Sequence, residues 1–129
     1  MSAITLSSLF SFISSYLIYL VLIKYNYVLT FNCTSKYNFL VSVAAILVLG
    51  LVLLLNLKNL CHLIFRLGFG LILGSGLYNI GTKIFSGCVP DYINFINIST
   101  INLADILLFV GLTMVIFSIF KYNKHSLRT

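Results

Sequence analysis

The sequence contains almost no acidic residues, because Asp91 and Asp105 are its only aspartates and it has no glutamate. Charged residues make up 8% of the chain, against roughly 25% in ordinary soluble proteins. The absence of tryptophan leaves any interfacial aromatic belt to tyrosine and phenylalanine. This composition excludes a soluble globular domain, and the length leaves room for one compact membrane domain over residues 1–129.

Apolar sequence is what the chain has in excess, with 60% hydrophobic residues and a mean hydropathy of +1.11. Its apolar runs of about 18–20 residues are each long enough to cross a hydrocarbon core. We therefore predict an all-α integral membrane protein with four transmembrane helices, at about 4–23, 39–57, 67–84 and 103–120. The first run is expected to be retained rather than cleaved as a signal peptide, because no basic residue precedes Lys24 and no small-residue cleavage site follows.

The third apolar run is rich in small residues. Within it, Gly70 and Gly74 form a G-x-x-x-G step, which lets helices approach closely in lipid. This helix is therefore predicted to pack inside the bundle.

Lysine and arginine are unevenly divided between the two predicted sides of the membrane. One side has Lys58, Arg66, Lys121, Lys124 and Arg128, and the other has Lys24, Lys36 and Lys83. Because cytoplasmic loops carry an excess of these residues, we predict that both termini are cytoplasmic. The loops at 24–38 and 82–102 then face outward, and both acids belong to the outer side.

The last outer loop places the two acids in different settings. Residues 88–95 are β-branched and aromatic enough for a short extended segment, and Pro90 restricts Val89 to an extended conformation. Asp91 is expected on this segment. Asp105 is expected in the first turn of the last helix, where the helix N-terminus stabilises a carboxylate by up to about 1 kcal/mol. Taken singly, Asp91 can be a turn residue and Asp105 an ordinary N-terminal charge.

Taken together, the two carboxylates can perform acid–base hydrolysis. Asn102 and Asp105 lie three residues apart on one helix face, and Asn79 and Lys83 lie four apart on another. If these faces meet beneath the outer loop, Asp91 lies between them. Neighbouring carboxylates share one proton, so the ionised member can activate water while the protonated member polarises a carbonyl or protonates a leaving amine. The two asparagines are expected to hold the substrate backbone or to orient the acids.

The remaining polar residues indicate neither a metal or cofactor site nor a nucleic-acid site. Cys33, Cys61 and Cys88 have no metal-ligand spacing, and we expect three free thiols, with a Cys33–Cys88 bridge on the outer side as the alternative. The basic residues are spread over both sides rather than gathered into a patch for nucleic acid. The basic segment at 121–128 is expected to meet anionic membrane lipids.

The segment from Gly74 to Gly111 resembles the catalytic half of lipoprotein signal peptidase, or signal peptidase II. Members of that family carry G-N-x-x-D-R, G-x-V-V-D-F and F-N-x-A-D in this order. The corresponding stretches here are G-L-Y-N-I-G-T-K at 76–83, G-C-V-P-D-Y at 87–92 and I-N-L-A-D at 101–105.

The resemblance implies a bacterial aspartic peptidase of the cytoplasmic membrane, with four helices, cytoplasmic termini and an active site toward the outer face. Asp91 and Asp105 would form its catalytic dyad. Its substrate would be the signal peptide of a diacylglyceryl-modified prolipoprotein, cleaved before the lipidated cysteine without a metal. The substrate-binding positions would be Asn79, Lys83, Asn102, Ala104 and Asn32.

The chain departs from the family at some of its characteristic positions. Thr82 and Lys83 stand where the family has Asp-Arg, so the positive charge remains but the bidentate fork of arginine and its acidic partner are lost. Leu20 replaces the acid of the family's D-x-x-x-K, leaving Lys24, and Thr34 replaces a glycine in a shortened first outer loop. These departures support an alternative, in which a degenerate relative binds lipidated precursors without cleaving them or acts as a small structural membrane protein.

Overall fold

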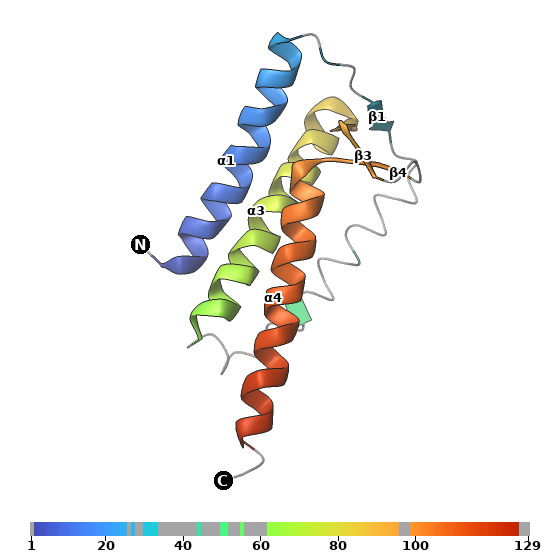
Figure 1. Cartoon of the computed structure of the whole chain (residues 1–129). Helices are drawn as coiled ribbons and strands as arrows, with labels where there is room; N and C mark the ends of the chain where they lie inside the picture. Colours follow the sequence, from blue (N-terminus) through green and yellow to red (C-terminus); the bar gives the residue numbers. More distant parts are fainter. Residues whose placement is uncertain are drawn as a thin grey trace.

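Three long helices dominate the computed structural model, which describes residues 2–25, 27, 30–33, 44, 50–51, 55, 62–95 and 99–126. They are α1 (Ala3–Lys24), α3 (Leu63–Ser86) and α4 (Leu103–Ser126), and each contains a stretch long and apolar enough to cross a membrane. These helices correspond to three of the four predicted spans. The predicted span at 39–57 lies almost entirely outside the described residues. The ribbon places Thr30–Cys33 and the start of α3 at opposite ends of the bundle (Figure 1).

Four short strands lie at the end of the bundle where α3 ends and α4 begins (Figure 1). They are β1 (Thr30–Cys33), β2 (Cys88–Asp91), β3 (Ile93–Phe95) and β4 (Ser99–Ile101). β1 pairs with β2 and β3 pairs with β4, both antiparallel. The extended segment predicted in the last outer loop is therefore present but divided at Tyr92, and each half has a partner strand that the sequence did not reveal.

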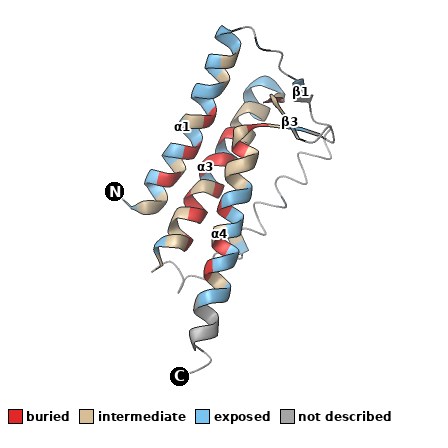
Figure 2. Cartoon of the chain, viewed as in Figure 1, coloured by how far each residue is buried: buried red, intermediate tan, exposed pale blue. Residues whose placement is uncertain are grey.

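The helix α3 lies between its neighbours and packs against both α1 and α4. Buried positions lie on the sides of the helices that face one another (Figure 2). A Cβ atom at Gly70 or Gly74 would collide with the backbone of α1, at Ile4 and Ser8 respectively. These glycines therefore allow the close approach that the G-x-x-x-G step predicts.

The contact between α3 and α4 also depends on glycine. A Cβ atom at Gly68 would lie 2.7 Å from the carbonyl oxygen of Gly111, and one at Gly111 would lie 2.6 Å from that of Gly68. Larger side chains fill the remaining space, in a buried cluster made of Phe65, Phe69, Ile72 and Val115. Small residues on different sides of α3 thus bring α1 and α4 close to it.

Serine side chains form a polar seam between α1 and α3. Ser7, Ser11 and Ser15 are the buried residues of α1, and they lie four residues apart on one side of the helix. The hydroxyls of Ser11 and Ser75 lie 2.8 Å apart, and Ser75 donates to the carbonyl of Leu71 at 2.6 Å. Interhelical hydrogen bonds of this kind contribute about 0.6 kcal/mol in membranes. The four-residue spacing of these serines is visible in the sequence and marks the side of α1 that packs against α3.

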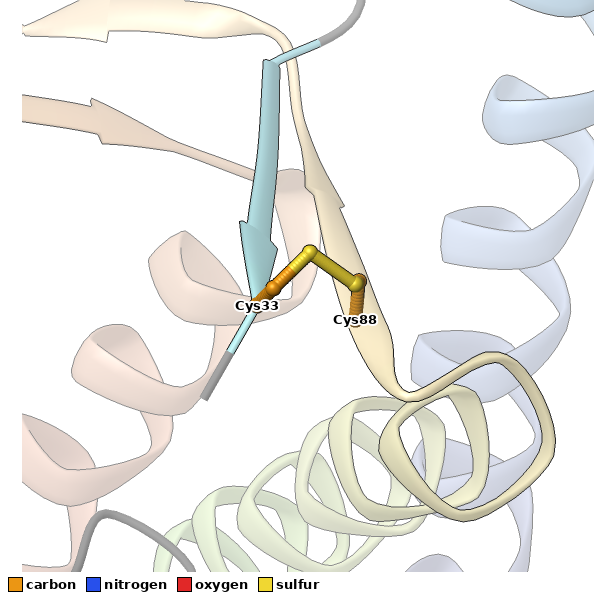
Figure 3. Close-up of a disulfide and its surroundings, with 2 residues drawn as sticks. All are labelled: Cys33 and Cys88. Atoms are coloured by element: carbon orange, nitrogen blue, oxygen red, sulfur yellow. A yellow bond between two sulfur atoms is a disulfide. The ribbon is translucent and has the colours of Figure 1, made fainter. Parts of the chain in front are cut away.

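Cys33 and Cys88 form a disulfide, so the prediction of three free thiols was wrong (Figure 3). The antiparallel register places the two residues directly opposite each other, with their Cα atoms 4.1 Å apart although they are 55 positions apart in sequence. The odd number of cysteines was the reason to expect free thiols. The number of cysteines, however, does not say which residues lie opposite each other in a pair of strands. Cys61, the third cysteine, lies outside the described residues.

The packing of α3 predicts different outcomes for alanine at two nearby glycines. Gly74→Ala should lower the free energy of unfolding by about 1–3 kcal/mol, the usual effect of overpacking, because its Cβ atom meets the Ser8 carbonyl and lies 2.9 Å from the Ser11 Cβ atom. Gly76→Ala is the matched control, since no atom of the described residues lies within 4 Å of a Cβ atom at that position. It should be neutral or stabilising by up to about 1 kcal/mol. Unfolding by SDS in mixed micelles measures both, and equal effects would contradict this packing.

Candidate active site

Asp91 is the last residue of β2 and is buried, with 3% of its surface exposed. Its backbone is anchored by β1, because Thr30 lies opposite it in the register and donates its hydroxyl to the Asp91 carbonyl at 2.8 Å. The preceding residues Val89 and Pro90 are also buried. The strand pair thus directs a carboxyl group into a largely closed site.

Asp105 lies in the first turn of α4, as predicted, and takes part in a reciprocal capping arrangement with Asn102. The Asp105 backbone N–H donates to Asn102 Oδ1 at 3.0 Å, and the Asn102 backbone N–H donates to Asp105 Oδ2 at 3.2 Å. This is the geometry of a capping box, in which the N-cap and N3 side chains each satisfy an unpaired N–H. Asp105 therefore has the structural role that the sequence left open, in addition to any chemical one.

Two amide side chains join the two acids. Asn102 Nδ2 donates to Asp91 Oδ1 at 3.1 Å and to Asn79 Oδ1 at 3.2 Å. Asn79 Nδ2 in turn donates to Asp105 Oδ1 at 2.8 Å. The faces of α3 and α4 that carry these asparagines therefore do meet, with Asp91 joined to them from β2.

Both polar atoms of the Asn102 side chain have hydrogen-bond partners in the network. This residue is 1% exposed, and its two amide hydrogens go to Asp91 and Asn79 while its oxygen accepts from Asp105. A buried polar group is costly unless it is satisfied, and a fully satisfied network rigidifies its site. The relative placement of the two acids therefore depends on this single side chain.

The other predicted site residues lie around this network in different ways. Lys83 is half-buried on α3, one turn beyond Asn79, and Ala104 is fully buried in the first turn of α4. The backbone of Asn32 pairs with Val89 in the β1–β2 register, while its side chain lies outside what the structure describes. Among the contacts that the structure describes, neither Lys83 nor Ala104 belongs to the hydrogen-bonded group of Asp91, Asn79, Asn102 and Asp105.

Thr82, which replaces the family's acid, directs its hydroxyl back toward its own helix. It donates to the carbonyls of Tyr78 and Asn79, each at 3.0 Å. Thr82 thus satisfies its polar group within α3 and contacts the site through the backbone of Asn79.

Tyr92 is a site residue that the sequence analysis missed. Its phenol oxygen accepts a hydrogen bond from the backbone N–H of Leu103 at 3.0 Å, so it satisfies the first N–H of α4. Burial raises the pKa of the Tyr92 phenol above its usual value, the Leu103 N–H opposes that shift, and the carboxylates of Asp105 and Asp91 add to it. The phenol is therefore protonated at neutral pH. The family motif G-x-V-V-D-F ends in Phe where this chain has Tyr92, and this difference was the sequence signal that could have pointed to the hydroxyl.

Among the residues that the structure describes, no three His, Cys, Asp or Glu side chains gather in a way that could hold a metal ion. The chemical groups at this site are two carboxyl groups, two amides and a phenol. They suit the binding of a peptide and the transfer of protons to and from it.

Comparison with known proteins places this chain in a family. The family model described as signal peptidase (SPase) II matches residues 3–121. A lipoprotein signal peptidase from Wigglesworthia glossinidia brevipalpis is 33% identical over 106 residues, which cover 77% of this chain and 66% of that protein. The chain thus spans just under two thirds of that relative's length. No solved structure matches the chain.

The capping role of Tyr92 predicts a measurable loss in stability. Tyr92→Phe keeps the ring but leaves the Leu103 N–H without its acceptor, which should lower the free energy of unfolding by about 1 kcal/mol. Tyr16→Phe is the matched control, since Tyr16 lies on α1 and 47% of its surface is exposed. Its effect should stay within about 0.5 kcal/mol. If SDS unfolding gives the same midpoint shift for both variants, Tyr92 does not support the start of α4.

Proposed function

The chain belongs to the signal peptidase II family, and on that premise we propose that it is an aspartic endopeptidase of the bacterial cytoplasmic membrane. Its proposed substrates are diacylglyceryl-modified prolipoproteins, from which it removes the signal peptide. The observation that carries the proposal is the hydrogen-bonded linkage of Asp91 and Asp105 through Asn79 and Asn102. The only two acidic residues of the chain thus come from separate elements into one network.

In the proposed mechanism Asp105 is the ionised member of the dyad. Both of its carboxylate oxygens accept hydrogen bonds from N–H groups, and it lies at the positive end of α4. The buried Asp91 holds the proton, because taking a carboxylate out of water is costly.

The reaction then follows from this charge distribution. Asp105 accepts a proton from water as the water oxygen attacks the scissile carbonyl carbon, and Asp91 donates its proton to the carbonyl oxygen. When the tetrahedral intermediate collapses, the C–N bond breaks and the leaving nitrogen takes a proton from Asp105. Asp91 regains its own proton from the hydroxyl as the carboxyl product forms. Acid–base assistance of this kind contributes about 10²–10⁴-fold to the rate.

The amides and the remaining residues have supporting roles in this proposal. Asn79 and Asn102 hold the two carboxyl groups and fix their orientation. Lys83, Ala104 and Asn32 are further proposed substrate-binding positions. The substrate reaches the site from the membrane, with its lipidated cysteine at the level of the outer strands.

The proposed orientation has the strands and the dyad on the outer side of the membrane and both termini in the cytoplasm. The distribution of lysine and arginine supports it. The disulfide between β1 and β2 supports it independently, because disulfides persist in oxidising compartments and are rare in the cytosol.

One observation favours a second candidate, a relative that binds lipidated precursors without cleaving them. Thr82 stands where the family motif has an acid beside the basic residue, so Lys83 has no acidic neighbour at this position. The hydroxyl of Thr82 instead donates to the backbone of α3. The binding and cleavage hypotheses differ in whether a diacylglyceryl-cysteine peptide is cut at all, which the following experiment measures.

Replacing either acid should abolish cleavage. Asp91→Asn and Asp105→Asn should each lower kcat by at least about 10²-fold, because each removes a proton donor or acceptor. An amide oxygen at position 105 can still accept the Asn102 N–H, so the capping arrangement is retained in part. Cleavage is measured with a synthetic diacylglyceryl-cysteine peptide carrying a fluorophore and a quencher.

Thr113→Ala is a suitable control for the dyad variants, because Thr113 is an exposed polar residue of α4 that bonds to its own helix at Phe109. It should retain wild-type kcat. Full activity of either aspartate variant would exclude the dyad. A folded wild-type protein that binds the peptide without cutting it would instead favour the second candidate.

The orientation predicts which cysteines are accessible from outside. In spheroplasts treated with a reductant, a membrane-impermeant maleimide should label Cys33 and Cys88 in a Cys61→Ser variant. In a variant with Cys33→Ser and Cys88→Ser, the remaining Cys61 should be labelled only after lysis, because the sequence places it in the opposite loop. The reverse pattern would show that the bundle is inverted.

A further inference from the structure

Asp91 differs from the other members of the hydrogen-bonded network in the kind of element that carries it. Asn79 is on α3, and Asn102 and Asp105 are at the start of α4, so long helices hold all three. Asp91 is on β2, whose strand partner is β1. A two-stranded antiparallel pair is at best marginally stable by itself. The position of the Asp91 carboxyl group therefore depends on what holds β1 against β2.

A contact at each end of the paired segment holds β1 and β2 together. At one end Thr30 lies opposite Asp91 and donates its hydroxyl to the Asp91 carbonyl at 2.8 Å. At the other end Cys33 lies opposite Cys88 and is bonded to it covalently. Both contacts are made by residues of β1, and the hydrogen bond from Thr30 holds the backbone of Asp91 itself.

The disulfide also connects β1 to the rigid part of the molecule. Cys88 directly follows Gly87, which ends α3 in a left-handed conformation with φ 71° and donates its N–H to the Lys83 carbonyl at 3.0 Å. Figure 3 shows the bridge between the two strands close to the end of α3. Through this bond β1 is anchored to the last turn of the same helix that carries Asn79.

We propose that the Cys33–Cys88 disulfide positions Asp91 for catalysis and that the peptidase reaches full activity only when this bond is oxidised. The inference rests on the proposed function. A dithiol reductant supplies two electrons and two protons, breaks the S–S bond, leaves two thiols and becomes a disulfide itself. Reduction releases β1 from β2 and from the end of α3, so the Thr30 contact no longer holds the Asp91 backbone in place. The two cysteines are positioning residues, since neither belongs to the dyad.

The test compares oxidised and reduced forms of the full-length protein in micelles, in a Cys61→Ser background that removes the third thiol. The probe is the fluorogenic diacylglyceryl-cysteine peptide. On reduction, kcat should fall about 10–100-fold, since misplacement of a catalytic group by 1 Å can cost roughly 10²-fold, while KM stays within about twofold. Reoxidation should restore kcat. Because the protein is already folded when it is reduced, circular dichroism can show that the helices persist.

A pH profile separates positioning from general stabilisation. If the disulfide positions Asp91, reduction changes the distance between the acids and shifts the limbs of the profile of kcat against pH. If it only stabilises the fold, the active fraction falls and the limbs stay where they are, and this outcome overturns the inference. A variant with Cys33→Ser and Cys88→Ser should reproduce the reduced enzyme and respond to neither reductant nor oxidant.

The two failures can be told apart. An oxidised enzyme that cuts the peptide, with the same kcat and pH profile after complete reduction, overturns the positioning role and leaves the proposed function intact. An oxidised, folded enzyme that never cuts the peptide overturns the proposed function and the inference with it. The Cys61→Ser protein should match the wild type in the oxidised state, because the bridge joins Cys33 and Cys88 and does not involve Cys61.

Discussion

The side chain of Asn102 is the interaction on which the candidate site depends, because it begins α4 and joins both acids at once. Its oxygen accepts the Asp105 N–H, and its amide hydrogens go to Asp91 and Asn79. A side chain that satisfies a helix terminus is held in one conformation by the backbone of that helix. The same conformation presents the amide group to Asp91, so the start of α4 and the arrangement of the carboxyl groups cannot change independently.

This arrangement requires that α3 come close enough to α4 for the two asparagines to touch. The glycines at 68 and 111 remove the Cβ atoms that would keep the helices apart, and the glycines at 70 and 74 do the same toward α1. Between helices in lipid, association depends on close packing and hydrogen bonds, because burial of apolar surface gives no net gain over contact with lipid. Small residues far from the two acids therefore determine whether Asn79 reaches Asp105.

Several features of this protein were predictable because each depends on only a few neighbouring residues. Helices occur at three of the predicted spans, and Asp105 lies in the first helical turn that its neighbours Asn102, Leu103 and Ala104 predict. The cysteine pair and the contribution of Tyr92 were not predictable in this way. Each depends on contacts between residues distant in sequence or on opposite sides of a turn, and no local pattern encodes such a register.

The sequence by itself determined the membrane class, the scarcity of acids and the motifs that place the chain in its family, because apolar length and short-range spacing are properties of the chain alone. Only the tertiary structure decided that Asp91 joins Asn102, that Asn79 joins Asp105 and that Cys33 lies opposite Cys88. These contacts join elements up to 55 positions apart. Their geometry follows from how closely the helices pack and from the register of two short strands, and both are settled only when the chain folds.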